Sequence, residues 1–493
     1  MQKHPYNPQQ WNHLVPDINS IIEQMEKVPI LSVGITPFTR IVPSFFLKNY
    51  SIYTVKRSSD VDVMEKFLPV HVLEDRHPEV AKKVHGTGYL IGNFAFQNFL
   101  KSRKIQPKLQ FYTMTEKIVK DLDRLGIAWI GNDPKTFQDV MYKGSFRELI
   151  KKLGLSSLPS DIYSREDFLA FSFNTLWKKY DGAFVVQRAD KETGGNEGTF
   201  FVHNTHDFEN CLSILAKDTD FGNIIITPFV EGYSTSMLGC IMPQGTLSGP
   251  LQLQLIDVPQ ALHGVPANGI FFGNDLDFHP WKEDIEEQAQ KVVEAIGAHL
   301  QTKGYKGIFG IDFLYDIKRN KIYPSECNPR FTGSLVLYSL MLLEAHVPPM
   351  EFFHLTTHLD IESSFDFDTV NQALKTRISC AHIAFSPRGI TDMGLSLPAG
   401  VYEYNPKIPS LEYKRPGISL ADMKSEHEFL IIDTVPSFGA SIEQQVPRLF
   451  KFIFPRSIAR SSYEIDIEAG YLVERFADVL LEAVSKKETT SQT

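Results

Sequence analysis

Cysteine is scarce in this chain. Four cysteines occur among 493 residues, they are widely separated, and none belongs to a C-x-x-C pair. That pattern disfavours a disulfide framework and a zinc site, because each needs clustered or regularly spaced thiols. We expect each cysteine to be a small buried hydrophobe in a reducing compartment, and the cytoplasm is the expected location. The four are Cys211, Cys240, Cys327 and Cys380.

Long apolar runs and an excess of basic residues are also missing. No run of about 18 apolar residues occurs, and the opening M-Q-K-H-P-Y-N-P-Q-Q-W-N has no apolar core of the kind found in signal peptides. With 50 Lys and Arg against 59 Asp and Glu, the formal charge is −9. Nucleic-acid binding normally needs a basic surface, so we expect neither a nucleic-acid nor a membrane partner.

The composition is that of a folded protein, with a hydrophobic share of 43% and a charged share of 22%. Short apolar strands alternate with helices over residues 1–134, which predicts an α/β domain with a parallel sheet of Rossmann-like topology. No G-x-G-x-x-G follows the first strand, so we predict no dinucleotide site. The expected strands are I-L-S-V-G-I from residue 30, S-I-Y-T-V-K-R from 51, G-Y-L-I-G-N from 88, K-L-Q-F-Y-T-M from 108 and I-A-W-I-G from 127.

The most informative segment is residues 306–334, K-G-I-F-G-I-D-F-L-Y-D-I-K-R-N-K-I-Y-P-S-E-C-N-P-R-F-T-G-S. It predicts two apolar strands joined by a tight polar turn. A hairpin folded symmetrically about Arg319 places Asp312 opposite Glu326, because the two residues are equally far from that centre. Since side chains alternate along a strand, we expect Glu326 to share a face with Ile322 and Pro324.

Two carboxylates opposite each other on paired strands repel, so a positive group is expected between them. Asp312, Glu326 and the amide of Asn328 are hard oxygen donors, which suit Mg²⁺ bound together with substrate phosphates. Arg330 follows with a planar guanidinium that fits a phosphate or a carboxylate. The alternative is an exposed hairpin whose acidic side chains are simply solvated.

The motifs G-I-F-G-I-D-F and S-E-C-N-P-R-F-T-G-S resemble the metal-binding end of the ATP-grasp superfamily, which consists largely of carboxylate–amine and carboxylate–thiol ligases. The resemblance implies a multidomain protein of mixed α/β and α+β class. A Rossmann-like domain over 1–134 would precede a two-lobed ATP-grasp fold over 135–350. Three further strands and the helix G-Y-L-V-E-R-F-A-D-V-L-L-E-A-V predict a smaller C-terminal α+β domain over 351–484, and the polar tail 485–493 is expected to be disordered.

A helix is predicted in M-Y-K-G-S-F-R-E-L-I-K-K-L, where apolar residues recur at helical spacing up to Gly154. Lys143 stands at its start, where a cation is unfavourable for the helix dipole unless an anion is near. The resemblance implies that Lys143 contacts an ATP phosphate. An ordinary solvated lysine is the alternative.

A glycine-rich turn joins two strands predicted at 184–187 and 199–202. Gly194, Gly195 and Gly198 would let backbone N–H groups approach phosphate oxygens, although hairpin turns use glycine for other reasons too. The superfamily often has a second phosphate-contacting lysine at the position of Gln187. Here Gln187 would donate a neutral hydrogen bond, with the missing charge supplied by Arg188 or Lys191.

The segment N-I-I-I-T-P-F-V-E-G-Y-S predicts a buried strand at 224–226, and its T-P-F-V-E-G resembles the connector that meets adenine in the superfamily. The resemblance implies backbone hydrogen bonds at Phe229 and Val230 and a ribose contact from Glu231. Pro228 has no N–H and cannot donate. The superfamily often has a glutamate where this chain has Ser234.

A loop rich in Pro and Gly over 256–275 carries His263 and Asn268, which we expect to contact substrate if the loop closes over the site. A plain connecting loop is the alternative.

These motifs together predict an ATP-dependent ligase that forms an amide or peptide bond through an acyl phosphate and releases ADP and phosphate. Catalysis would rest on Glu326, Asn328 and Arg330, with ATP and Mg²⁺, for which Mn²⁺ can substitute, as cofactors. The expected partners are a small carboxylate and an amine, either an amino acid or a peptide, and a second copy of the chain in a homodimer. An ATP-grasp carboxylase or kinase is an alternative, and so is an ATP-binding regulatory or scaffold protein without turnover.

Overall fold

The N-terminal part is built on a parallel sheet. The computed structural model describes residues 6–190, 198–218, 220–262, 269–386, 393, 396–405, 410–437 and 448–478. The first sheet has the order β3-β2-β1-β4-β5, and every neighbouring pair is parallel, as the βα alternation predicted. Its strands are β1 Ile30–Val33, β2 Tyr50–Thr54, β3 Val70–Val72, β4 Lys108–Phe111 and β5 Trp129–Ile130.

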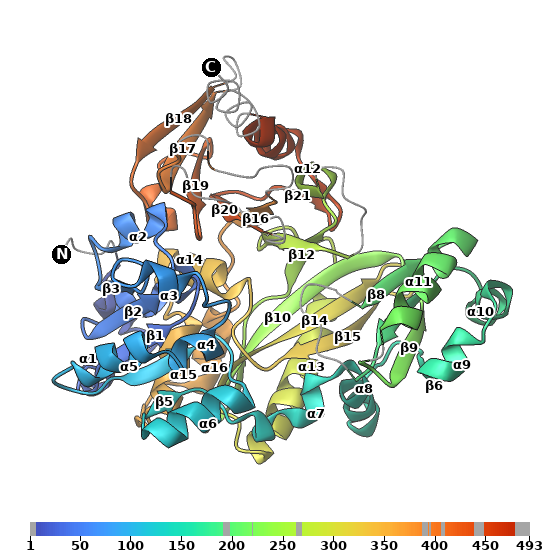
Figure 1. Ribbon diagram of the computed structural model, residues 1–493, viewed down its shortest axis with the longest axis horizontal. Helices are drawn as coiled ribbons and strands as arrows, with labels where there is room; N and C mark the ends of the chain where they lie inside the picture. The colour runs from blue at the N-terminus through green and yellow to red at the C-terminus, as the bar shows by residue number, and fades with distance from the viewer. Residues whose placement is uncertain are drawn as a thin grey trace.

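Helices connect and cover these strands, in the blue region of Figure 1. They are α1 Ile18–Met25, α2 Ser59–Met64, α3 Pro78–Ala81, α4 Thr87–Ile91, α5 Phe94–Lys101 and α6 Glu116–Leu125. The strand predicted for G-Y-L-I-G-N is wrong, because these residues lie in and just after α4. A short apolar run between glycines does not distinguish a strand from a buried helical turn. Here Leu90 and Ile91 are buried while Tyr89 is exposed, as a helix allows.

Residues 161–228 form a small lobe, which projects on the right of Figure 1. Its antiparallel sheet has the order β6-β9-β7-β8, and a separate apolar core of phenylalanine, isoleucine and valine side chains joins the sheet to its helices. The strands predicted at 184–187, 199–202 and 224–226 are confirmed. The elements are β6 Asp161–Ser164, α9 Arg165–Leu169, α10 Phe173–Tyr180, β7 Phe184–Arg188, β8 Thr199–Val202, α11 Thr205–Lys217 and β9 Asn223–Pro228.

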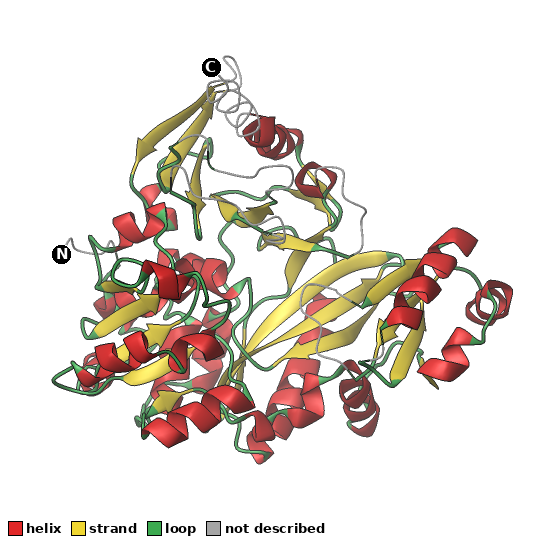
Figure 2. Ribbon diagram, in the orientation of Figure 1, coloured by secondary structure: helices red, strands yellow, loops and turns green. Residues whose placement is uncertain are grey.

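A large antiparallel sheet crosses the middle of the molecule, as Figure 2 shows in yellow. Its order is β15-β14-β10-β12-β13-β16-β20-β19-β17-β18, with β11 paired to β10. The elements before its C-terminal strands are α7 Gln138–Met141, α8 Lys143–Lys152, β10 Gly232–Met242, β11 Gly245–Ser248, β12 Gln252–Ile256, α12 Pro259–Leu262, β13 Phe271–Asp275, α13 Glu283–Thr302, β14 Gly307–Asp316, β15 Lys321–Asn328, α14 Leu335–Glu344, α15 Met350–His358 and α16 Phe367–Ala373.

The C-terminal strands continue this same sheet, because β16 pairs with β13. The three predicted C-terminal strands are present as β16, β17 and β19, and the predicted closing helix is described over 467–478. The C-terminal strands are β16 Ala381–Phe385, β17 Gly400–Asn405, β18 Ser410–Arg415, β19 Glu428–Ile432, β20 Phe450–Phe454, β21 Ala459–Ser461 and β22 Glu464–Ile465.

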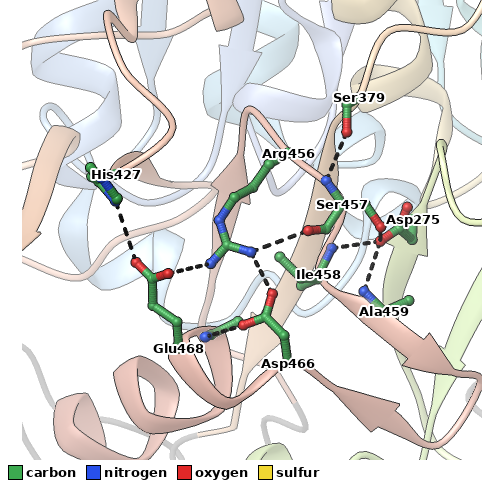
Figure 3. Close-up of polar contacts among 10 residues, drawn as sticks. Asp275, Ser379, His427, Arg456, Ser457, Ile458, Ala459, Asp466 and Glu468 are labelled. Carbon is green, nitrogen blue, oxygen red and sulfur yellow. Dashed lines mark hydrogen bonds and ion pairs between the residues drawn. The ribbon is translucent and has the colours of Figure 1, made fainter. Parts of the chain in front are cut away.

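Asp275, at the end of β13, ties the segment 457–459 to the sheet (Figure 3). Its Oδ2 accepts hydrogen bonds from Ser457 Oγ at 2.9 Å and from the N–H groups of Ile458 at 2.8 Å and Ala459 at 2.9 Å. Next to it, Arg456 forms ion pairs with Asp466 and Glu468 at the start of the closing helix. These contacts fix the C-terminal segment beside the strands that carry the candidate site.

All four cysteines are buried and free, as predicted. Burial raises the pKa of the Cys211, Cys240 and Cys327 thiols above the ordinary thiol range. Among the described residues, no helix combines the length and the apolar character needed to cross a membrane.

Candidate functional site

The hairpin of β14 and β15 places Asp312 directly opposite Glu326, as predicted. The register shifts between Asp312 and Phe313, because Ser325 is an extra residue on β15, and its Oγ donates a hydrogen bond to the Asp312 carbonyl at 3.0 Å. A β-bulge of this kind reverses which residues share a face. The prediction that Glu326 shares a face with Ile322 and Pro324 is therefore wrong.

Tyr323, and not Ile322 or Pro324, shares a face of the hairpin with Glu326. It pairs with Leu314 on β14 and lines the same cavity as Glu326. The single inserted residue thus brings an aromatic side chain beside the acidic pair.

Asp312 is surrounded by both attractive and repulsive groups. Its Oδ1 accepts a hydrogen bond from Gln254 Nε2 at 2.9 Å, and its Oδ2 accepts one from Asn328 Nδ2 at 3.0 Å. Burial and then the neighbouring Glu326 carboxylate raise the pKa of Asp312 to about 7, against the opposing influence of Arg330 and Lys143. An added cation between the two carboxylates would relieve this repulsion.

The donor set therefore fits a divalent cation that prefers oxygen. Mg²⁺ usually takes one or two protein carboxylates and keeps waters or phosphates for the rest. Among the described residues no group of three or more His, Cys, Asp or Glu side chains gathers for a metal. Water or phosphate oxygens would supply the remaining ligands of a Mg²⁺ ion. Asn328 here uses its amide nitrogen toward Asp312 and its oxygen toward Arg330, at 2.8 Å.

Lys143 begins α8, as predicted, and its Nζ lies 2.9 Å from Glu326 Oε2. Its side chain is 13% exposed, so it is not the solvated lysine of the alternative. The Glu326 carboxylate is thus one anion that offsets the unfavourable position of Lys143 at the start of the helix.

Two cavities meet at the acidic pair. One, of about 160 Å³, lies between the small lobe and the hairpin; the other, of about 240 Å³, lies between the large sheet and residues 330–334. Both are lined by Gln254, Ile256, Asp312 and Glu326. We refer to them as the lobe cavity and the sheet cavity.

The lobe cavity has a cationic part and an apolar part. Lys143 lines it near Glu326, and an apolar cluster of Leu158, Val230, Tyr323 and the partly buried Leu314 forms another part of its wall. Phe229 also lines the cavity, but its N–H donates to the Ala183 carbonyl at 2.9 Å. Only its carbonyl is left for an adenine, while the N–H of Val230 has no protein acceptor among the described residues.

Glu231 does not lie where the predicted ribose contact would require it. Glu231 is 71% exposed, pairs with Lys318 at 2.7 Å, and is not part of the cavity lining. Ser234, the neutral residue at the superfamily's usual glutamate position, does line the cavity, and its N–H donates to Ser462 Oγ at 3.0 Å.

Gln187 lines the lobe cavity and donates from Nε2 to Thr199 Oγ1 at 3.3 Å. Arg188 does not line it: its guanidinium pairs with Asp218 at 2.6 Å and lies over the ring of Phe221. Successive strand residues point to opposite faces, so Arg188 cannot share the cavity with Gln187. The proposed substitution of charge by Arg188 is therefore wrong.

Several predicted residues fall outside the described parts of the chain. These are Lys191, Gly194 and Gly195 in the glycine-rich turn, and His263 and Asn268 in the 256–275 loop. Gly198 is described and has φ +96°, a conformation that favours glycine.

The sheet cavity is polar, and Arg330 lies on its wall. The Arg330 guanidinium donates to Asn328 Oδ1 at 2.8 Å and to the Phe331 carbonyl at 3.0 Å, and it lies 5.9 Å from the ring centre of Tyr112. Arg448, from the C-terminal strands' side, lines the same cavity above Phe271. An anionic group of a small molecule could be held here.

The residues of these cavities that the sequence motifs did not identify include Tyr112, Arg147, Gln254 and Arg448. Only Arg147 carried a local signal, because it stands four residues after Lys143 and therefore on the same helix face. The other three reach the site through sheet pairing and domain packing.

Residues 182–334 match the family model of the ATP-grasp domain. This match confirms the superfamily resemblance, and the chain contains an ATP-grasp domain. The arginine-specific large chain of carbamoyl phosphate synthase from Geobacillus stearothermophilus is 22% identical over 223 residues. That alignment covers 45% of this chain and 19% of the relative, so the chain matches about a fifth of the relative's length.

Solved structures show the same fold. Biotin carboxylase from Campylobacter jejuni superposes with a TM-score of 0.58 at 12% identity, covering 88% of each chain. The biotin carboxylase domain of Hydrogenobacter thermophilus 2-oxoglutarate carboxylase gives 0.55 at 12%, covering 86% of this chain and 85% of that one. N5-carboxyaminoimidazole synthase from Aspergillus clavatus gives 0.50 at 11%, covering 92% and 99%. The predicted α/β multidomain, ATP-grasp fold is thus confirmed.

Proposed function

We propose that this ATP-grasp protein is an ADP-forming ligase, which activates a carboxylate with ATP and joins it to an amine. The observation that carries the proposal is the meeting of two cavities at Asp312 and Glu326. The lobe cavity offers an apolar wall for a base and a lysine for phosphates. The sheet cavity offers Arg330 for the group that is to be activated.

The chemistry begins with attack of a substrate carboxylate oxygen on the γ-phosphorus of ATP. The bond from that phosphorus to the β,γ-bridging oxygen breaks, ADP leaves, and an acyl phosphate forms. The amine nitrogen then attacks the acyl carbon, the bond to the phosphate oxygen breaks, and phosphate leaves as the nitrogen loses a proton. Phosphoryl transfer requires in-line placement and charge neutralisation rather than a protein nucleophile.

The side chains supply placement and charge. Asp312, Glu326 and Asn328 would hold Mg²⁺, which neutralises negative charge on the phosphates when bound. Lys143 lies within an ion-pair distance of Glu326 and would turn toward the phosphate chain. Arg330, fixed by Asn328 and the Phe331 carbonyl, would orient the substrate carboxylate and then the acyl phosphate.

An amino acid or a peptide is the substrate class we propose. The sheet cavity measures about 240 Å³ and combines arginine side chains with the rings of Tyr112 and Phe271, which suits a small molecule with one anionic group and some apolar surface. The 256–275 loop, with His263 and Asn268, would complete the substrate contacts. Formation of a homodimer is also proposed.

A carboxylase is the second candidate, and the solved structures favour it. Two of them carry the name biotin carboxylase and a third is a carboxyaminoimidazole synthase. In that case bicarbonate would take the place of the organic carboxylate in the sheet cavity.

The test is release of ADP and phosphate from Mg-ATP, with pools of amino acids and dipeptides in one arm and bicarbonate with candidate amines in the other. Stimulation by the first arm supports the ligase, and stimulation that needs bicarbonate supports the carboxylase. Glu326→Gln is expected to abolish the stimulation. Glu412→Gln on β18, whose side chain is 68% exposed, is the matched control and should leave it unchanged. Mg-ATP binding without stimulation in either arm would contradict both and favour a binding protein without turnover.

A further inference from the structure

Arg147 is a buried cation whose guanidinium keeps two nitrogens unpaired among the described residues. It lies on α8, its residue is 3% exposed, and neither Nε nor Nη1 has a hydrogen-bond acceptor within the described parts of the chain. Burial lowers the pKa of Arg147 to about 10, so the guanidinium remains charged at neutral pH. An unpaired buried charge is costly, and native proteins rarely keep one without a purpose.

The side chain lines the lobe cavity. Arg147 stands one helical turn after Lys143, on the same face of α8, and Lys143 marks the end of the cavity where Glu326 lies. Gln187 lines the cavity as well but carries no charge, and Arg188 is paired with Asp218 on the other face of its strand. Arg147 is thus a cation of this cavity whose position leaves it available for an anion.

We propose that Arg147 binds the phosphate chain of the nucleotide in the lobe cavity, next to the phosphates that Lys143 would contact. The inference rests on the proposed ATP site. A planar guanidinium with unpaired donors is suited to two oxygens of a phosphate, and its charge replaces the one that Gln187 lacks. The nucleotide phosphates would satisfy the Arg147 donors that the described residues leave unpaired.

Binding of ADP, ATP and adenosine to the full chain, measured by isothermal titration calorimetry with Mg²⁺ present, tests this role. Arg147→Met removes the charge and keeps the length of the side chain. We expect its affinity for ADP and ATP to fall by about 10- to 100-fold, the loss of a charge-assisted hydrogen bond. The affinity for adenosine should stay within about twofold of the wild type, because adenosine has no phosphate.

Two further variants separate phosphate binding from support of the fold. Arg147→Lys keeps a cation and should retain most of the affinity for ADP. Gln187→Lys added to Arg147→Met returns a cation to the cavity and should recover affinity. Arg165→Met is the matched control, because Arg165 lies in the small lobe with its guanidinium bonded to the carbonyls of Leu215, Ala216 and Asp218. Its ADP affinity should not change.

The thermal midpoint without nucleotide gives a second readout. Arg147→Met removes an unpaired charge, so its midpoint should equal or exceed that of the wild type, whereas Arg165→Met should lower it. Equal ADP affinity of Arg147→Met and the wild type would overturn the inference. So would equal losses for ADP and adenosine accompanied by a lower midpoint, which would make Arg147 a support of the fold. If the wild type binds no ADP or ATP, the proposed ATP site itself fails.

Discussion

Asp275 and Asp312 are two aspartates of the same sheet in opposite situations. Asp275, on β13, is fully buried and accepts five hydrogen bonds: two on Oδ1 from the N–H groups of Asp277 and Phe278, and three on Oδ2 from residues 457–459 (Figure 3). Asp312, on β14, accepts two amide hydrogen bonds, faces the Glu326 carboxylate, and lines both cavities.

The difference separates a structural carboxylate from the one that we propose to be functional. Around Asp275 the protein itself supplies donors for the charge, so nothing is left for a ligand to do. Around Asp312 the protein adds a second negative charge and leaves open space on two sides. Such an arrangement is unfavourable for the protein alone, and the cation and phosphate chain that we propose to bind there would make it favourable. Removal of the carboxylate charge should therefore reduce activity at Asp312 and stability at Asp275.

The largest expected effect is on activity at Asp312. Asp312→Asn keeps the shape of the side chain but removes a charge from the proposed Mg²⁺ site, and we expect substrate-stimulated ADP release to fall by about 1000-fold, or about 4 kcal/mol. The thermal midpoint without ligands should not decrease, because repulsion with Glu326 is relieved. The Gln254 side-chain amide can turn its oxygen toward the new NH₂ group, which the backbone N–H donors around Asp275 cannot do. A midpoint lowered by as much as that of an Asp275 variant would contradict the distinction.

The corresponding change at Asp275 should affect stability instead. Asp275→Asn puts an NH₂ group against N–H donors in either amide orientation, because both carboxylate oxygens already accept hydrogen bonds. We expect a loss of about 3 to 5 kcal/mol in unfolding free energy, measured by urea denaturation. Ser457→Ala, which removes one of the five donors, is the graded control with an expected loss of about 1 kcal/mol. A mild effect of Asp275→Asn would mean that water enters the site.

Much of this contrast could be predicted from the sequence on the Asp312 side. The spacing along the predicted hairpin placed Asp312 opposite Glu326, and the helical pattern placed Lys143 at the start of a helix. The inserted Ser325 escaped prediction, because the shift of a bulge is set by pairing and not by local pattern. The face assigned to Glu326 was wrong for this reason, and Tyr323 was missed.

The surroundings of Asp275 could not be predicted from any local sequence pattern. Three of its five donors come from residues 457–459, which are far away in the chain. They arrive because they follow β20, which pairs with β16, and β16 pairs with β13. Gln254 and Arg448 were missed for a similar reason: sheet order decides which strands adjoin the hairpin. Parallel topology at the N-terminus, by contrast, follows from the βα alternation that the sequence shows directly.

A third buried carboxylate extends the comparison to pH. Glu351 is fully buried, accepts a hydrogen bond from the Ser339 hydroxyl, and has its pKa raised to about 7 by burial. The folded protein therefore binds a proton more tightly than the unfolded chain, and stability falls as the pH rises from about 4.5 through about 7. Glu351→Gln stays neutral and should gain on the order of 2 kcal/mol over the wild type at about pH 8.

The measurement for Glu351 is the difference in thermal midpoint between variant and wild type at two pH values. At about pH 5 the side chain is protonated in the fold, and the two proteins should differ little. At about pH 8 the variant should unfold at a higher temperature. An equal difference at both pH values would show that Glu351 is not neutral at low pH, or that the amide is poorly accommodated beside Ser339.

The smallest effect is expected where carboxylates face water. Arg57 pairs with Asp62 at 2.6 Å, Glu65 at 3.0 Å and Asp75 at 2.6 Å, and its side chain is 31% exposed. Arg57→Gln leaves three carboxylates without their cation, yet solvent can hydrate each of them, so we expect a loss of only about 1 kcal/mol at low salt. The loss should shrink at about 1 M salt, where such charges are screened. Urea denaturation at both salt concentrations measures it. A loss as large as that of Asp275→Asn would mean that the number of charges, and not their access to water, decides the cost, and the separation of Asp275 from Asp312 by their surroundings would lose its basis.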